Sequence, residues 1–174
     1  MVIAVSAANS PAAAQPSPTV RQAIDAAYSR LEVSMGPHGS ATQLLVVLKD
    51  ILAPGALRVQ MLRNTEWTIK NGGDHDEKLV IAHSLRMNSL TVTGRRAVAV
   101  VVQRGDVVRT DSAGSYGARG KDHRLSGTML YRDTWIKTPA GWRLTATEGI
   151  TSTMMVDGKP WNPPAAMTIH NPQP

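Results

Sequence analysis

The chain contains no cysteine and no phenylalanine. Without cysteine it can form no disulfide, no thiolate nucleophile and no thiolate-ligated metal site. This absence excludes chemistry but does not identify a cellular compartment. Without phenylalanine, the large aromatic anchors of the core must come from the four Trp and three Tyr residues, and the eight Met residues can fill irregular gaps around them.

Long apolar runs and runs of basic residues are also missing. No segment reaches the roughly 18 to 20 apolar residues that a membrane-spanning helix needs, so no membrane span is predicted. The net charge is +6, but the basic residues are scattered and only Arg95 and Arg96 are adjacent. We therefore expect a basic soluble surface and no nucleic-acid partner. The 174 residues, 42% of them hydrophobic, suit one globular domain.

The N-terminal stretch MVIAVSAANSPAAAQPSP has no charged residue and is rich in Ala, Ser and Pro. Its sequence AAAQ fits a signal-peptide cleavage site ending at Ala14, although the basic start of a signal peptide is missing. A disordered leader with little to bury is the alternative. We expect an exported protein, periplasmic or secreted, in preference to a cytoplasmic one. Residues 1–18 form the leader in this division, 19–158 the folded domain and 159–174 a Pro-rich tail.

Two helices are predicted at the start of the folded domain. Apolar residues recur on one helical face over 19–35, and Tyr28 lies on that face. A strongly apolar helix is predicted over 41–52, where a Pro-Gly pair follows. Both segments begin with a sequence that fits a capping box.

The middle of the chain is harder to interpret. Apolar residues over 56–70 alternate in part, and we interpret most of this segment as a strand. The sequence NGGD at 71–74 predicts a turn. The segment 78–92 is ambiguous, and we interpret it as a short helix over 78–86 that runs into a strand.

The rest of the domain is strand-like. Strands are predicted over 95–111, 123–138 and 141–156, and TPAG at 138–141 predicts a hairpin turn between the last two. Early helices and late strands predict an α+β domain, a cone-shaped curved antiparallel sheet with N-terminal helices packed on its concave side. The mouth of such a cone is a natural ligand site.

The hairpin YRDTWIKTPAGWRLTATE, the sequence VDGKP after it and the early AIDAAYSRL resemble the nuclear transport factor 2-like superfamily, including its SnoaL-like and ketosteroid isomerase-like domains. The resemblance is strongest over 124–158 and extends through the element order to 19–158. It implies a pocket between the curved sheet and the first helices. It also implies a homodimer, because many such domains dimerise through the exposed sheet face.

The resemblance also implies roles for single residues. In the isomerases, a helix Tyr and a protonated late-strand Asp donate hydrogen bonds to a developing enolate oxygen, and a second carboxylate moves the proton. Tyr28 and Asp133 match the two donors. Glu66 is the only carboxylate where the proton-moving group is expected, and it lies later than the family pattern suggests.

Asp133 shares one strand face with Tyr131 and Trp135, because side chains alternate along a strand. If this face is concave, burial should raise the pKa of Asp133. If the face is convex, Asp133 should pair with Arg143 across the hairpin. The sequence alone leaves both possibilities open.

The candidate ligand contacts in the cone are Trp67, His83, Tyr131, Trp135 and Glu148. Trp67 and Trp135 could equally be core or rim anchors, and a lone His is often structural. Glu148 could form an acid–base pair with Asp133 if both point inward, and His83 is an alternative base.

No metal or cofactor is expected. The sequence GGDHDEK at 72–78 gathers oxygen and imidazole groups, but their spacing is too compact for a metal loop, and we interpret it as a solvated turn. The serine-nucleophile motif G-x-S-x-G is missing. The expected function is binding of a small apolar or amphipathic molecule in the cone. The alternatives are a lyase, isomerase or cyclase, and an assembly or protein-interaction domain whose cone is filled by its own side chains.

Overall fold

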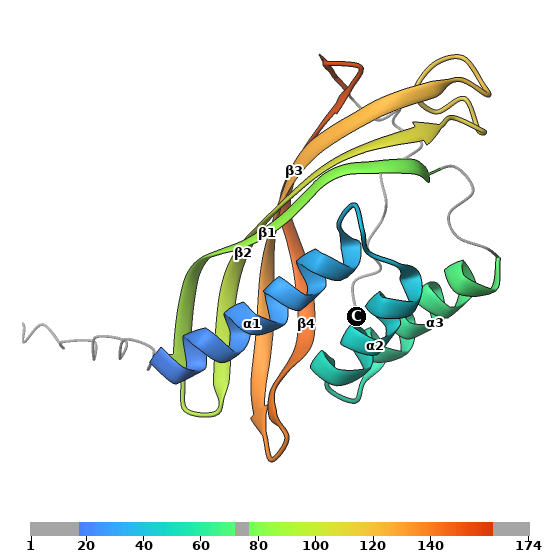
Figure 1. Cartoon of the computed structure of the whole chain (residues 1–174). Helices are drawn as coiled ribbons and strands as arrows, with labels where there is room; N and C mark the ends of the chain where they lie inside the picture. The colour runs from blue at the N-terminus through green and yellow to red at the C-terminus, as the bar shows by residue number, and fades with distance from the viewer. Residues whose placement is uncertain (1–17, 72–76, 162–174) are drawn as a thin grey trace, which may run out of the picture.

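A computed structural model of the chain describes residues 18–71 and 77–161. Three helices lead into five strands (Figure 1). They are α1 (Pro18–Met35), α2 (Ala41–Ile51), α3 (Ala56–Lys70), β1 (Glu77–Thr93), β2 (Arg96–Thr110), β3 (Asp122–Thr138), β4 (Gly141–Val156) and β5 (Lys159–Pro160). The predicted leader cleavage site at Ala14 and most of the Pro-rich tail lie outside the described residues.

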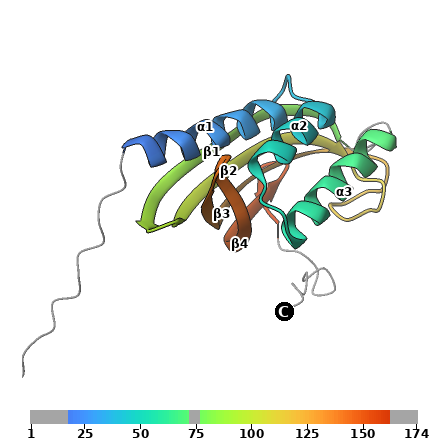
Figure 2. The same ribbon diagram turned by 90° about the horizontal axis from the view of Figure 1, so that it is seen from below.

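The five strands form one antiparallel sheet in the order β1-β2-β3-β4-β5. The sheet is strongly curved, and α1 crosses its concave face while α2 and α3 lie beside it (Figures 1 and 2). This arrangement confirms the predicted α+β cone. The upper ends of the strands in Figure 1 run well past α1.

The first two helices lie where the sequence predicts them, within one residue at each end. Ser40 accepts a hydrogen bond from the backbone N–H of Gln43 at 3.2 Å, which caps the start of α2. At the other end of α2, the Arg58 guanidinium donates to the carbonyls of Lys49 and Leu52, both at 2.7 Å. This side-chain cap holds the start of α3 against the end of α2.

The prediction of a strand over 56–70 is wrong, because this segment is α3. Leu57, Met61 and Thr65 recur four residues apart on its inner side, and the Thr65 hydroxyl donates to the Met61 carbonyl at 2.9 Å. Leu, Arg, Gln, Met and Glu, which favour helices, fill much of the segment. The partial alternation of apolar residues therefore concealed a helical period.

The prediction of a helix over 78–86 is also wrong, because these residues belong to β1. The pairing of β1 with β2 shifts register at three places along the strand. Each irregularity interrupts the alternation of inward and outward side chains. The sequence pattern over this segment therefore does not show the period of two that identifies a strand.

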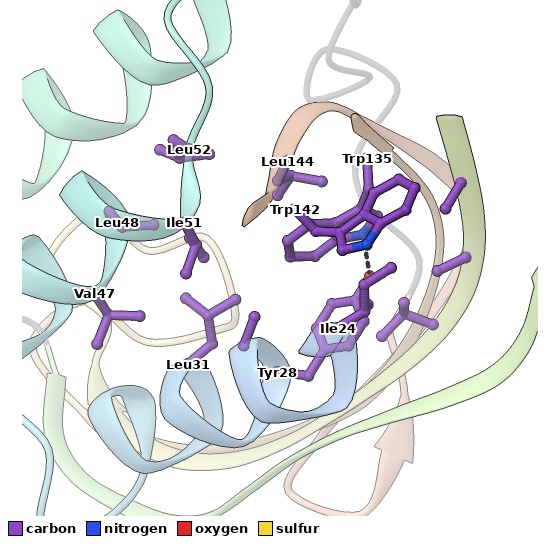
Figure 3. Packing of buried hydrophobic residues seen from close by; sticks show 14 of the residues in the cluster. Ile24, Tyr28, Leu31, Val47, Leu48, Ile51, Leu52, Trp135, Trp142 and Leu144 are labelled. Carbon is purple, nitrogen blue, oxygen red and sulfur yellow. Dashed lines mark hydrogen bonds between the residues drawn. The ribbon is translucent and has the colours of Figure 1, made fainter. Parts of the chain in front are cut away.

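The hydrophobic core lies between α1, α2 and the lower half of the concave sheet face (Figure 3). Ala97 and Ala99 of β2 are fully buried and are the register partners of Trp135 and Asp133 on β3. Their short side chains leave room for the side chains of α1 over the sheet. None of the described helices is long and apolar enough to cross a membrane.

Candidate functional site

Tyr28 and Asp133, the two residues matched to oxyanion donors, meet at the base of the cone. The Tyr28 hydroxyl donates to Oδ2 of Asp133 at 2.8 Å, and the indole Nε1 of Trp135 donates to the Tyr28 hydroxyl at 3.1 Å. The Tyr28 and Trp135 rings also meet edge to face, with centroids 5.5 Å apart (Figure 3). Thr147 on β4 donates to Oδ1 of Asp133 at 2.5 Å. We call these four residues the base cluster.

Three of the four side chains of the base cluster are almost completely closed to solvent, and the fourth, Thr147, is exposed. Tyr28 is 3% exposed, Asp133 is 6% exposed and Trp135 is fully buried. Asp133 therefore lies on the concave face, and the alternative in which it pairs with Arg143 is wrong. Arg143 instead contacts Asp50 of α2 at 3.4 Å.

Burial dominates the electrostatics of the base cluster. It raises the pKa of Asp133 above the ordinary value, although the hydrogen bonds from Thr147 and Tyr28 act in the opposite direction. Burial also raises the pKa of Tyr28 far above its ordinary value, and the nearby Asp133 charge adds to this shift. Tyr28 therefore stays protonated, and its hydroxyl donates a hydrogen bond to Asp133.

A second buried carboxylate, Asp111, has the opposite environment. Burial acts to raise its pKa, but backbone N–H groups of the following loop outweigh that effect and lower it. Ser115, Tyr116 and Gly117 donate these bonds at 2.7, 2.6 and 3.1 Å. Asp111 therefore organises the loop between β2 and β3 as a buried acceptor.

The hydrogen bonds of the base cluster limit its chemistry. An oxyanion site would need free protons on both Tyr28 and Asp133, aimed at one external oxygen. Here the Tyr28 proton is directed to Asp133, and the two Asp133 oxygens accept from Tyr28 and Thr147. The structure brings Tyr28 and Asp133 together as predicted, but Tyr28 donates its hydrogen bond to Asp133 and not to an external oxygen.

The predicted proton-moving carboxylates lie elsewhere. Glu66 is exposed on α3, and its neighbour Trp67 is 61% exposed. Glu148 is on the opposite face of β4 from Thr147, and its carboxylate accepts from Arg132 at 2.9 Å. None of the three therefore belongs to the base cluster.

His83 is on the concave face of β1, near the end of α1. The amide nitrogen of Gln103 lies 2.9 Å from its Nε2, and because an amide nitrogen only donates, the ring proton belongs on Nδ1. Nδ1 is buried and makes no hydrogen bond within the described residues. Burial lowers the pKa of His83, although the Glu32 carboxylate on α1 acts to raise it. His83 is therefore held neutral.

Above the base cluster, the concave face is open. Met129 of β3 is 43% exposed, and Tyr131 lies beside it with its hydroxyl against the Met129 sulfur. The register places Gly105 opposite His83 and Gly149 opposite Tyr131. We call this region the open concave surface, formed by His83, Gln103, Gly105, Met129, Tyr131 and Gly149.

The sequence did not indicate a third region, the apolar groove between α1 and α2. The groove has a volume of about 520 Å³ and includes Val33, Val46 and Val47 among its lining residues. Val33 and Val46 are exposed and lie outside the core. The sequence signal for this groove would have been apolar residues, such as Val33 and Val46, that lie beyond the part of each helix that packs against the core.

Within 18–71 and 77–161, no three acidic or histidine side chains gather as a metal site would require. Most of GGDHDEK lies outside these ranges.

No protein-family model matches the chain, and no curated protein matches it significantly. Solved structures do match. A nuclear transport factor 2-like superfamily protein from Salmonella enterica serovar Typhimurium aligns with a TM-score of 0.52 and 19% identity, covering 78% of this chain and 94% of that protein. Protein Kfla4162 from Kribbella flavida aligns with a TM-score of 0.56 and 11% identity, covering 79% and 95%. The chain therefore has a nuclear transport factor 2-like fold.

Proposed function

We propose that this nuclear transport factor 2-like domain binds a small apolar or amphipathic molecule on the open concave surface. The fold is a general scaffold for ligand binding or catalysis, so the choice depends on the site itself. The proposal rests on two glycines of this surface, Gly105 and Gly149, which leave open space above the sheet.

Neither glycine is required by the backbone or by packing. Gly105 and Gly149 are not among the residues with positive φ, so an L-amino acid could adopt either conformation. A Cβ atom at either position meets no atom of the described residues within 4 Å. Gly127 differs, because its Cβ would lie 2.6 Å from the Thr153 carbonyl oxygen. Gly105 and Gly149 instead keep the concave face clear of side chains.

The groups around the two glycines suit an amphipathic molecule. Met129 and the Tyr131 ring offer apolar surface, and Gln103, which is held by His83, offers a side-chain amide at one side. Ligand sites in proteins combine mainly apolar walls with a few placed polar groups. The base cluster below supports this surface and closes the cone beneath it.

Catalysis through Tyr28 and Asp133 has less support. Both side chains are buried and engaged with each other and with Trp135 and Thr147. The filled base fits the alternative of an assembly domain in part, but that alternative does not explain why the upper concave face is left open.

Fluorescence titration with the uncharged probe N-phenyl-1-naphthylamine tests the proposal. Gly105→Leu and Gly149→Leu should each weaken probe binding about tenfold or more, because leucine fills the space that the probe needs. Both variants should keep a cooperative thermal unfolding transition. Val46→Gln in the α1–α2 groove is the matched control and should bind as the native protein does. The proposal would be contradicted if both leucine variants bound the probe as the native protein does, or if Val46→Gln lost probe binding.

We also propose that two copies associate through the convex sheet face. No described helix covers this face (Figure 2), and Val98, Val100 and Ile136 lie on it, partly exposed. Size-exclusion chromatography with light scattering should show a dimer for the native protein and a monomer for Val98→Glu. A native protein that stays monomeric at high concentration contradicts this.

A further inference from the structure

A polar hollow lies on the convex face of the sheet, on the side opposite the cone. It has a volume of about 350 Å³ and is lined by Ser84, Arg86, Asn88, Val102 and Arg104. Ser84 pairs with Arg104, and Arg86 pairs with Val102, so β1 and β2 bring the two arginines to diagonal positions on one face.

The other arginines of this face with a defined partner are neutralised by carboxylates. Arg124 makes a two-pronged contact with Asp106, at 2.9 and 2.5 Å, and Arg132 contacts Glu148 at 2.9 Å. Asp106 is two residues from Arg104 on the same strand face, but both of its oxygens are engaged by Arg124.

Arg86 and Arg104 are exposed, and neither makes an ion pair within 18–71 and 77–161. Two like charges on neighbouring strands repel each other, so an unpaired arginine pair has a cost that an anion would remove. The hollow between them is also polar, because Ser84 offers a hydroxyl group and Asn88 a side-chain amide.

We propose that this hollow binds a phosphate group, either free or as a phosphate ester. Arginine forks match phosphate oxygens in a two-pronged geometry, and Ser84 and Asn88 supply neutral donors for the remaining oxygens. The volume fits a small phosphorylated molecule. The site is separate from the open concave surface and does not depend on the function proposed there. It shares the convex face with the proposed dimer contact but lies further along β2 than Val98 and Val100, so the two proposals use different stretches of that face.

Isothermal titration with inorganic phosphate at constant ionic strength tests the site. The native protein should bind one phosphate per chain, and sulfate should compete, because it is also a tetrahedral dianion. Arg86→Gln and Arg104→Gln should each weaken binding about tenfold or more, as expected for losing charge-assisted hydrogen bonds. Arg63→Gln, an exposed α3 residue with the same loss of charge, should leave the affinity within about twofold.

Two further arms identify the source of the phosphate. Flotation with phosphatidylcholine vesicles, with and without phosphatidic acid, should show arginine-dependent binding if the group is a lipid headgroup. Phosphate binding without vesicle binding assigns a free or small-molecule phosphate. Absence of saturable binding in both arms, or equal losses in all three variants, overturns the proposal. It is also overturned if the Arg86 and Arg104 variants change only the oligomeric state, because a second copy would then occupy the hollow.

Discussion

The two ends of the concave sheet face are built differently. At the base, Tyr28, Trp135 and Asp133 are buried, and each polar atom of the cluster has a partner. At the open end, glycines stand where side chains would fit, and Met129 is 43% exposed. The contrast shows that two polar residues that match the oxyanion donors of a known family can be buried and hydrogen-bonded to each other within the fold. It also gives each region its own expected response to mutation.

Removing Trp135 should have the largest effect. Trp135 is fully buried and contacts Tyr28 both through its ring and through its indole N–H. Trp135→Ala should lower the free energy of unfolding by about 3–5 kcal/mol, because it leaves a large cavity. Trp67→Ala on exposed α3 should change it by no more than about 0.5 kcal/mol. Urea unfolding measures both, and similar losses in the two variants would contradict the contrast.

Removing a single hydroxyl at the base should have a smaller effect. Tyr28→Phe leaves Trp135 Nε1 without an acceptor and Oδ2 of Asp133 without a donor. We expect a loss of about 1–3 kcal/mol in unfolding free energy, the cost of leaving buried polar groups unsatisfied. Tyr131→Phe is the control at the open end, where the hydroxyl hydrogen-bonds, among the described residues, to the weakly accepting sulfur of Met129. Urea unfolding measures both variants. Equal losses of unfolding free energy in Tyr28→Phe and Tyr131→Phe would contradict the difference between the base and the open end of the cone.

Two glycine substitutions separate required from optional glycines. Gly127→Ala should cost about 1–3 kcal/mol, because its Cβ would collide with the backbone of β4. Gly105→Ala should be neutral or stabilise by about 0.4–1 kcal/mol, because it restricts the unfolded chain and meets no obstacle. Thermal unfolding of both variants checks this, and a destabilised Gly105→Ala would show that packing fills the open end.

The smallest effect is a pH dependence that arises from Asp133. A carboxyl whose pKa is raised by burial binds more protons in the folded state over the interval between its unfolded and folded pKa values. Its contribution to stability is complete below this interval and falls as pH rises through it. The unfolding free energy of the native protein minus that of Asp133→Asn should therefore decrease with rising pH and then level off. A difference that increases with pH would contradict the raised pKa.

The sequence predicted the helical start, the late hairpin and the shared face of Tyr131, Asp133 and Trp135. It could not show which face is concave, because β2 carries Val98 and Val100 on one side and Ala97 and Ala99 on the other. Both sides are apolar, so hydrophobicity does not distinguish them.

Other features depend on contacts between distant parts of the chain. Tyr28 and Asp133 are 105 residues apart in the chain, and only the folded sheet shows that they satisfy each other. Register shifts in β1 interrupt the period of two by which a strand is recognised. The apolar residues of α3 alternate in part, so its helical period was not recognised in the sequence. The open concave surface could not be predicted either, because a glycine in a strand gives no sign of the space above it.

An NMR titration with N-phenyl-1-naphthylamine tests whether the cone is closed at its base and binds a small molecule at its open end. Assigned ¹⁵N spectra would follow the backbone amides of Gly105 and Gly149 together with the indole N–H of Trp135. We expect the two glycine amide signals to shift and saturate while the Trp135 indole signal stays in place. Movement of the Trp135 signal with unchanged glycine amides would contradict this expectation, because the probe would then enter the base.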